Sequence, residues 1–500
     1  MIIDILCLRA LECYVRQIRT NGEVEHEVEH MVKIRDTVFR EYDIRGRVSD
    51  DELNIHSVET LARAFGSLIR REKGRTTAIV GYDSRKCSPD FRDAAVRGLN
   101  SAGCSSVDIG MVTTPVFYFA QYMLGIPSGI MITGSHNPDG WSGLKMADDF
   151  SSTLLSDGVG KIRDIIINND FHSGHGRAFN FDGIKAAYIA ALAWRVKPGR
   201  RLRIAIDAGN GTAGIYAPAL FRSAGFDVVE IFCELDPSFP NHFPNPSDIR
   251  SLEILSRKTV ESRADIGLSF DGDGDRLGVV DEKGAVVSSD RVLILLARQI
   301  LQEKPGARIV FDVKCTKALI EDIEARGGVP VMCRTGHSYI KRRIHEEKAA
   351  LGGEHSGHIF IVDDYYGFDD GLFAGLKLAE YLSHRDRPFS GIMKTTRQYF
   401  SSPNIQVACP DEKKYTVVES LVREFKDEFG EENVIDINGA RVNIADGWGL
   451  VRASSNLPVL VIMLEAATRE GYLQIKSILK EKLKKFPEVG DKWENDIDPF

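Results

Sequence analysis

Three segments of the sequence repeat one short pattern: an apolar strand that ends at an aspartate, then a polar turn and a helix-like stretch. These segments are residues 78–83, 203–207 and 308–312, and they end at Asp83, Asp207 and Asp312. Their spacing is on the order of one hundred residues, the usual size of a domain. Strands that alternate with helices predict parallel α/β units. We therefore expect three similar α/β domains in tandem.

The pattern changes near residue 400. A helix-like stretch at 417–429 precedes two apolar runs, 442–444 and 459–464, which are separated by a turn-rich loop and followed by a charged amphipathic helix. This mixture predicts a smaller α+β domain. The resulting division has an N-terminal extension (1–35), three α/β domains (36–181, 182–285 and 286–397) and the α+β domain (398–490).

The composition excludes several classes of protein. The chain of 500 residues is 43% hydrophobic and 27% charged, as in a multidomain globular protein, and no apolar run approaches the roughly 20 residues of a membrane helix. A net charge of -8 provides no basic surface for nucleic acid. The eight cysteines are scattered and no export signal opens the chain, so we expect free thiols and a cytoplasmic location.

The run at 128–133 is apolar enough for a buried strand, and it ends at a break, Gly-Ser-His-Asn-Pro (134–138). Open α/β sheets bind ligands at the carboxyl ends of their strands, where this break would present the Ser135 hydroxyl. The motif by itself also suits a simple turn, because glycine and Asn-Pro favour turns. Ser135 is thus a candidate nucleophile that needs partners elsewhere in the chain.

A second candidate site is the loop Asp-Gly-Asp-Gly-Asp-Arg (271–276), which lies between strand-like runs. Its carboxylates Asp271, Asp273 and Asp275 occupy alternate positions and can converge on one hard cation. The spacing also fits an EF-hand, but Arg276 stands where that loop needs glycine, and strands replace the flanking helices. We expect a Mg²⁺ loop at a strand end, with a solvated acidic turn as the alternative.

Two further loops are rich in polar side chains. Gly-Gly-Glu-His-Ser-Gly-His (352–358) places Glu354 and Ser356 at a spacing that suits two sugar hydroxyls. Arg-Ala-Ser-Ser-Asn-Leu-Pro (452–458) combines a guanidinium with hydroxyls and an amide, which together can hold an anion such as phosphate. Either loop could instead be a plain surface turn.

The order of the four motifs narrows the chemistry. A nucleophile, a divalent-cation loop, a hydroxyl-binding loop and a phosphate-binding loop follow one another, one in each expected domain. Phosphoryl transfer needs mainly positioning and charge neutralisation, which a metal and cationic side chains supply. The sequence has no Walker loop for a nucleotide. The combination predicts an enzyme of phosphoryl transfer.

These motifs, in this order, resemble the α-D-phosphohexomutase family, and most closely its bacterial phosphomannomutase/phosphoglucomutase branch. The resemblance runs from residue 39 to about residue 484. Besides the four loops it includes Phe-Arg-Glu-Tyr-Asp-Ile-Arg-Gly (39–46), Gly-Tyr-Asp-Ser-Arg (81–85), Phe-Pro-Asn-His (239–242), Asp-Val-Lys-Cys-Thr (312–316), Gly-His-Ser (336–338) and Gly-Trp-Gly-Leu-Val-Arg (447–452). It implies four domains around one central cleft in a monomer, with an oligomer as the alternative.

The resemblance assigns roles to the matching positions. Ser135 would carry the phosphate and, with Asp271, Asp273 and Asp275, would hold one Mg²⁺. Lys145, His358 and Arg45 would act on the reacting phosphate and its proton transfers. The residues that would bind substrate are Tyr42, Arg276, Lys314, His337, Glu354, Ser356, Arg452, Ser454, Ser455 and Asn456. The four domains would then hold, in order, the phosphoserine, the metal, the sugar and the phosphate that is not transferred.

The implied activity interconverts hexose 1-phosphate and hexose 6-phosphate, with mannose and/or glucose as the sugar. Phospho-Ser135 would give its phosphate to the sugar, and the resulting hexose 1,6-bisphosphate would turn end for end and return the other phosphate. The bisphosphate is then both intermediate and activator. The implied partners are hexose phosphates, with no nucleic acid and no membrane.

Two other functions stay open on the sequence. One is a phosphoglucosamine mutase, whose sugar loop usually has Gln or a similar residue where this chain has His355. The other is a hexose-phosphate binding protein without turnover. It stays open because the phosphate loop reads Ser-Ser-Asn (454–456). Asp139 and Ser142 also depart from the common family sequence, which bears on substrate preference and rate more than on the type of reaction.

Overall fold

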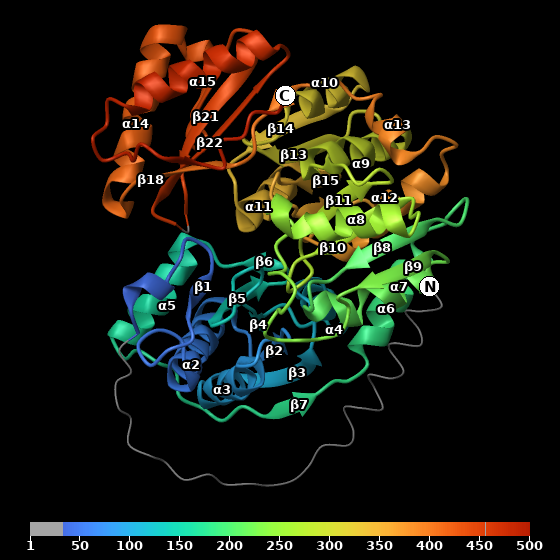
Figure 1. The fold of residues 1–500 in the computed structure, drawn as a ribbon. Helices are drawn as coiled ribbons and strands as arrows, with labels where there is room; N and C mark the ends of the chain where they lie inside the picture. The colour runs from blue at the N-terminus through green and yellow to red at the C-terminus, as the bar shows by residue number, and fades with distance from the viewer. Residues whose placement is uncertain (1–33, 456) are drawn as a thin grey trace. The chain divides into compact units, whose positions relative to one another are not determined.

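The computed structural model describes residues 34–455 and 457–500, and four β-sheets organise this part of the chain (Figure 1). The first three sheets are mixed and lie among helices, whereas all strand pairs of the fourth are antiparallel. The prediction of three α/β domains and a smaller α+β domain is confirmed. The predicted N-terminal extension lies outside the described residues, apart from its last two.

The repeat seen in the sequence is a repeat of sheet topology. In each α/β domain three parallel strands are followed by a fourth strand that runs antiparallel to the third, and their spatial order is fourth, third, first, second. The strands are β2 (Thr77–Tyr82), β3 (Ser105–Met111), β4 (Gly129–Ile132) and β5 (Trp141–Asp149); β8 (Arg203–Asp207), β9 (Asp227–Ile231), β10 (Ile266–Phe270) and β11 (Leu277–Asp281); and β13 (Arg308–Asp312), β14 (Val329–Cys333), β15 (Leu351–Gly353) and β16 (Ile359–Ile361). The strand that leads to the repeated aspartate is the first strand each time, in the interior of its sheet.

The remaining elements of these domains extend or cover the sheets. The additional strands are β1 (Ile44–Arg47), β6 (Ser152–Thr153), β7 (Ala178–Asn180) and β12 (Val286–Val287). The α-helices are α2 (Ile55–Lys73), α3 (Ser88–Ser101), α4 (Thr114–Leu124), α5 (Ser156–Ile167), α6 (Ile184–Trp194), α7 (Ala217–Ser223), α8 (Glu253–Glu261), α9 (Ser289–Glu303), α10 (Lys317–Ala325), α11 (His337–Glu347), α12 (Gly371–Ser383) and α13 (Phe389–Met393).

Local sequence explains where α2 begins and ends. At its start the N–H of Ser57 donates to Asn54 Oδ1 (3.0 Å) while the N–H of Asn54 donates to Ser57 Oγ (2.8 Å), a reciprocal cap. At its end Gly74 has a φ of +64°, which glycine adopts without strain. Between them Leu61 and Phe65 recur at helical spacing and are fully buried in the core of the first domain, and α2 also packs against α3.

The fourth domain differs from the sequence prediction in one element. Its elements are β17 (Phe400–Ser401), β18 (Ile405–Ala408), α14 (Asp411–Phe429), β19 (Val434–Ile435), β20 (Ala440–Ile444), β21 (Gly447–Ala453), β22 (Val459–Ala466), α15 (Arg469–Leu483) and β23 (Trp493–Glu494). The sequence predicted a turn-rich loop at 452–458, and the chain between β21 and β22 follows it except at 452 and 453, which belong to β21; the strand β21 itself, between β20 and β22, was not predicted. Gly447 and Gly449 in this strand serve close packing. A Cβ on Gly447 would lie 1.9 Å from the carbonyl oxygen of Glu465, and one on Gly449 would lie 3.0 Å from Ile475.

The hydrophobic cores do not follow the division into sheets. One continuous apolar cluster takes side chains from all three α/β domains, including Tyr118, Leu220 and Leu293, each at most 1% exposed. The α+β domain has a core of its own around Leu421 and Ile462, beneath α14 and α15 (Figure 1). The first three domains thus share apolar packing, and the fourth packs mainly within itself.

Two further expectations concern the cysteines and the absence of membrane-spanning helices. The cysteines at positions 87, 104, 233, 315, 333 and 409 are free thiols, as predicted for them. Within 34–455 and 457–500, no helix combines the length and apolar character needed to cross a membrane.

Candidate active site

All four motifs found in the sequence occupy the same structural position, the tip of an antiparallel hairpin. The serine motif joins β4 to β5, the three-aspartate loop joins β10 to β11, and the Gly-Glu loop joins β15 to β16. The arginine loop joins β21 to β22 in the same way. In the three α/β domains the tip therefore follows the third parallel strand, at the carboxyl edge of the sheet.

The repeated aspartates contribute to holding these tips. Asp83 Oδ2 accepts a hydrogen bond from the N–H of Gly134 (2.9 Å), and Asp312 Oδ1 accepts one from the N–H of His355 (3.1 Å). In the second domain Asp207 instead contacts His242, with an N–O distance of 3.1 Å. The sequence showed the repeated aspartates but not the contacts that they make.

The serine loop has a backbone that presents Ser135. This residue has a φ of +47°, an uncommon conformation for a side chain other than glycine, and it is 3% exposed. Its hydroxyl lies 3.0 Å from Asp271 Oδ2 of the second domain and 3.1 Å from Nδ1 of His136. The candidate nucleophile and the candidate metal loop are thus in direct contact, although 136 residues separate Ser135 from Asp271 in the chain.

Two arginines fasten the serine loop to the rest of its domain. Arg45, predicted to be catalytic, donates to the carbonyl oxygen of Gly134 (2.7 Å) and to Asn137 Oδ1 (2.9 Å). Arg85, which received no role from the sequence, is buried and donates to the carbonyl oxygens of Ser135 and Pro138, both at 2.8 Å. Its motif was visible in the sequence at 81–85, but only the fold shows what the guanidinium holds.

Gly134→Ala should disturb this loop. A Cβ at this position would lie 2.1 Å from Arg85 Nε, so the guanidinium would have to leave the carbonyl groups that it now holds. We expect turnover to fall by roughly 10²-fold, the effect of misplacing a reacting group by about 1 Å. Steady-state kinetics provide the measurement. Gly160→Ala is the matched control, because a Cβ there meets no atom within 4 Å. Equal turnover of Gly134→Ala and Gly160→Ala would contradict the predicted clash with Arg85.

The three-aspartate loop brings its carboxylates together as predicted. Asp271, Asp273 and Asp275 are fully buried, and one ligand oxygen from each lies within 4.8 Å of the others. Strands rather than helices flank the loop, in agreement with the rejection of an EF-hand. Oδ1 of Asp273 and Oδ1 of Asp275 are buried without a hydrogen-bond partner. Such oxygen atoms fit a hard divalent cation, so these residues could hold a metal ion.

The charges around this loop are unbalanced without a cation. Lys145 on β5 donates to Asp273 Oδ2 (2.9 Å) and to Asp275 Oδ2, and Thr114 donates to Asp273 Oδ2 (2.6 Å). Burial, and then the charges of Asp275 and Asp273, raise the pKa of Asp271 well above its usual range. One ammonium group therefore does not compensate three buried carboxylates, and a divalent cation would.

Lys145 itself remains a cation in this setting. Burial alone would lower the pKa of its ammonium group, but Asp273 and Asp275 outweigh burial and hold that pKa well above its usual range. Lys145 can therefore neutralise developing negative charge or donate a proton.

The third hairpin tip places its carboxylate beside the first turn of α11. Glu354 is 2% exposed and accepts a hydrogen bond from the N–H of Gly336 (2.5 Å), while the Ser356 hydroxyl lies 3.5 Å from its other oxygen. His337 begins α11 and packs edge-on against Tyr42 of the first domain, with ring centroids 5.0 Å apart. The predicted substrate residues Tyr42, His337, Glu354 and Ser356 thus form one neighbourhood.

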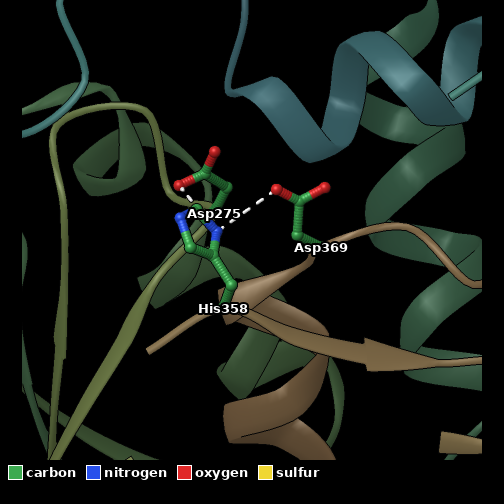
Figure 2. A group of neighbouring side chains, drawn as sticks. All are labelled: Asp275, His358 and Asp369. Carbon is green, nitrogen blue, oxygen red and sulfur yellow. Dashed lines mark ion pairs between the residues drawn. The ribbon is translucent and has the colours of Figure 1, made fainter. Parts of the chain in front are cut away.

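His358 links this tip to the metal loop. Arg276 Nε donates to His358 Nε2 (3.0 Å), and the other ring nitrogen, Nδ1, lies 3.2 Å from Asp369 Oδ2 and 3.6 Å from Asp275 Oδ1 (Figure 2). Asp369 was missed by sequence reasoning, because it stands in a stretch, Phe-Asp-Asp-Gly (368–371), that resembles an ordinary helix start. The structure joins Ser135, the three aspartates, Lys145, Arg276 and His358 in one network.

Comparison with known proteins agrees with this geometry. Four domain families of phosphoglucomutase/phosphomannomutase match the chain in order: alpha/beta/alpha domain I at 36–173, domain II at 184–284, domain III at 288–399 and the C-terminal domain at 405–482. The chain belongs to the phosphoglucomutase/phosphomannomutase family.

Relatives of similar length support the membership. A phosphomannomutase/phosphoglucomutase of Pseudomonas aeruginosa is 39% identical over 90% of this chain and 96% of its own. A phosphoglucomutase of Neisseria gonorrhoeae is 38% identical over 92% of this chain and 99% of its own. A crystal structure of a family protein from Burkholderia thailandensis has a TM-score of 0.85 at 36% identity, and covers 93% of this chain and 100% of its own. The predicted enzyme class, a phosphohexomutase, is confirmed.

The fourth hairpin tip of this phosphohexomutase is only partly described. Arg452 is 8% exposed, and its Nε is buried without a hydrogen-bond partner. Ser454 and Ser455 follow at the end of β21, and Lys414 donates to the carbonyl oxygens of Ser454 and Leu457. The prediction for Asn456 lies outside the described residues.

Lys314 is the remaining predicted substrate residue, and it sits where the third domain of the phosphohexomutase meets the fourth. Its Nζ lies 3.3 Å from Asp312 Oδ2. Arg441 of β20 donates to the carbonyl oxygens of the two neighbours of Lys314, Val313 and Cys315, the latter at 3.2 Å. Arg441 was not predicted, since nothing in its local sequence indicates a partner 126 residues away.

Proposed function

We propose that this phosphohexomutase carries phosphate on Ser135 and exchanges it between C1 and C6 of mannose and glucose phosphates. The main support is the contact between the buried Ser135 hydroxyl and Asp271, within a cluster of three carboxylates and Lys145. A hydroxyl in that position can accept and release a phosphoryl group next to a cation site.

In the first half-reaction, O6 of a hexose 1-phosphate attacks the phosphorus of phospho-Ser135. The O6–P bond forms as the P–Oγ bond breaks, and the electron pair of the broken bond stays on Ser135 Oγ. The O6 proton passes to Nε2 of His358, and Lys145 returns a proton to Oγ. Arg276 must release Nε2 for this step, and its guanidinium then suits the transferring phosphate.

The second half-reaction runs in the opposite direction on the other end of the sugar. The hexose 1,6-bisphosphate turns end for end, and its 1-phosphate passes to Ser135. Lys145 regains its proton from the Ser135 hydroxyl, and protonated His358 gives its proton to the leaving O1. No net phosphate is consumed, and the phosphoserine is restored.

The other polar groups orient the sugar and its second phosphate. Glu354 and Ser356 would bind O3 and O4, which are alike in glucose and mannose, so either sugar would fit. Arg452, Ser454 and Ser455 would hold the phosphate that is not transferred, with Lys314 and His337 nearby. Mg²⁺ held by Asp271, Asp273 and Asp275 would supply charge neutralisation at the transferring phosphoryl group.

The names of the relatives favour this substrate class over glucosamine phosphate, because the relatives described above are named for mannose or glucose. Retention of Ser135 and of all three aspartates favours turnover over mere binding. We further expect a cytoplasmic monomer.

The test combines labelling with a comparison of sugars. Incubation with hexose 1,6-bisphosphate carrying radioactive phosphate should leave label on Ser135, located by digestion and mass spectrometry. Mutase rates with mannose and glucose 1-phosphates should exceed the rate with glucosamine 1-phosphate. An unlabelled protein without mutase activity would contradict the proposal, and the fastest rate with the glucosamine sugar would reassign the substrate.

A further inference from the structure

We propose that Asp369 is a positioning residue that fixes the tautomer of His358, keeping the ring proton on Nδ1 and the lone pair on Nε2. The inference deepens the proposed function, because it depends on the role of His358 as the proton acceptor. Asp369 has received no role from the sequence or from the family resemblance.

The tautomer follows from the chemistry of the two neighbours. A guanidinium has only donors, so the hydrogen bond from Arg276 Nε to Nε2 of His358 (3.0 Å) requires an unprotonated Nε2. A neutral imidazole then carries its proton on Nδ1. Nε2 is thus the nitrogen that keeps a lone pair for an incoming hydroxyl.

Asp369 is the group that faces this proton. Its Oδ2 lies 3.2 Å from Nδ1, closer than Asp275 Oδ1 at 3.6 Å (Figure 2). Both carboxylates are acceptors, but Asp275 is also engaged by Lys145. Among the described residues, neither oxygen of Asp369 has a hydrogen-bond partner, so its acceptor capacity is available to the imidazole.

The position of Asp369 is fixed from several sides. The next residue, Asp370, caps α12 by accepting a hydrogen bond from the N–H of Phe373 (2.9 Å). Gly371 follows so close to the metal loop that a Cβ would lie 2.6 Å from the carbonyl oxygen of Arg276. Lys341 of α11 lies 3.4 Å from Asp369 Oδ1, the oxygen that is not the one closest to His358. The carboxylate can therefore neither turn away nor withdraw easily.

His337 is a competing partner for the same carboxylate. Its Nδ1 lies 3.7 Å from Asp369 Oδ2, 0.5 Å farther than that of His358 (3.7 minus 3.2 Å). His337 also approaches Asp43, with Nε2 3.8 Å from Oδ2. The shorter distance assigns the carboxylate to His358, and the experiment must observe the two rings separately.

Asp369→Asn distinguishes tautomer control from simple packing. The amide oxygen should face the ammonium group of Lys341, which turns the NH₂ group toward Nδ1 of His358. An NH₂ group can only donate, so the ring proton should move to Nε2, opposite the Arg276 donor. We expect kcat to fall by roughly 10²-fold or more, as for other wrong-tautomer substitutions, with KM changed by less than about threefold.

The tautomer itself is measured by side-chain ¹⁵N NMR on protein labelled at its 12 histidines, at about pH 8, where an ordinary imidazole is neutral. The signals of His358 and His337 are assigned by their loss in His358→Gln and His337→Gln. The wild type should show His358 with its proton on Nδ1, and Asp369→Asn should show it on Nε2. Wild-type His358 with a proton on Nε2 would overturn the inference even if Asp369→Asn does not fold.

Asp370→Asn is the matched control. Asp370 is adjacent and also buried, and the side chains that donate hydrogen bonds to it are those of Tyr188 and Tyr365 rather than His358. Asparagine is also a good helix cap, so the substitution should preserve the start of α12. This variant should keep the wild-type tautomer and kcat within about threefold of the wild type. A tautomer change in Asp370→Asn, or a loss of kcat equal to that of Asp369→Asn, would overturn the specific role of Asp369. An unchanged kcat in Asp369→Asn, despite an inverted tautomer, would also overturn it. Failure of the proposed function is separate, because it would appear as a wild type without mutase activity, whatever its tautomer.

Discussion

Ser135→Ala is expected to lower mutase turnover by roughly 10⁴-fold or more, the scale of loss when a covalent nucleophile is removed. The substitution removes the hydroxyl that lies 3.0 Å from Asp271 and leaves the surrounding loop held by Arg45 and Arg85. Binding of hexose phosphates should therefore change little. A coupled mutase assay measures the turnover, and calorimetric titration with a hexose 6-phosphate measures the binding.

Ser128→Ala is the matched control for this substitution. Ser128 immediately precedes β4, at the end opposite the serine loop, is also buried, and donates to the carbonyl oxygen of Asp148 (3.1 Å). Its loss should cost about 1 kcal/mol of stability, the usual contribution of one hydrogen bond, and leave turnover near the wild-type value. Substantial residual turnover in Ser135→Ala would exclude the phosphoserine.

Asp273→Asn should be the second most damaging substitution. Asp273 is fully buried and accepts hydrogen bonds from Lys145 and Thr114, and its other oxygen is free for a cation. The change removes one of three negative charges at the metal loop, so Mg²⁺ should bind much more weakly. We expect turnover at low Mg²⁺ to fall by roughly 10³-fold, with part of the loss recovered at high Mg²⁺.

A Mg²⁺ titration of turnover, combined with direct calorimetry of Mg²⁺ binding, measures this effect. Asp281→Asn provides the control, because Asp281 is a buried aspartate of the same domain that accepts hydrogen bonds within the turn after β11. Its Mg²⁺ dependence should be that of the wild type. If Asp273→Asn kept the wild-type Mg²⁺ affinity, the three aspartates would not be the metal site.

Local sequence patterns predicted most of the strands and helices, but they missed features that depend on packing between distant residues. The strands before Asp207 and Asp312 were visible because apolar runs ended at a polar turn, and the hydrogen-bonded ladder follows the same limits. The strand β21, which contains Gly447 and Gly449, was missed. Their small size serves the approach of Glu465 and Ile475, which the sequence does not place nearby. The continuous core of the first three domains was also missed, because the sequence does not show which distant side chains pack together.

The candidate site shows a similar division. The three aspartates could be identified from their spacing, since alternating carboxylates indicate a cation loop. Ser135 could be identified only together with the other motifs, since the serine motif alone also suits a simple turn. Arg85 and Asp369 could not, because a buried arginine and an aspartate before a helix have ordinary structural roles in most proteins. Their significance depends on contacts with the serine loop and with His358.

The sequence by itself determined the succession of strands and helices along the chain, the three repeated aspartates and the four loops that carry the chemistry. These features follow from hydrophobic pattern and residue type over a few neighbouring positions. The family resemblance had already grouped Ser135 with Asp271 around one Mg²⁺, and tertiary structure added their direct contact. Tertiary structure alone decided that Asp369 faces His358. It also decided that the repeated aspartates hold two of the hairpin tips. The physical reason is that sheet topology brings together the carboxyl ends of strands far apart in the chain, and no local pattern encodes which side chains then meet.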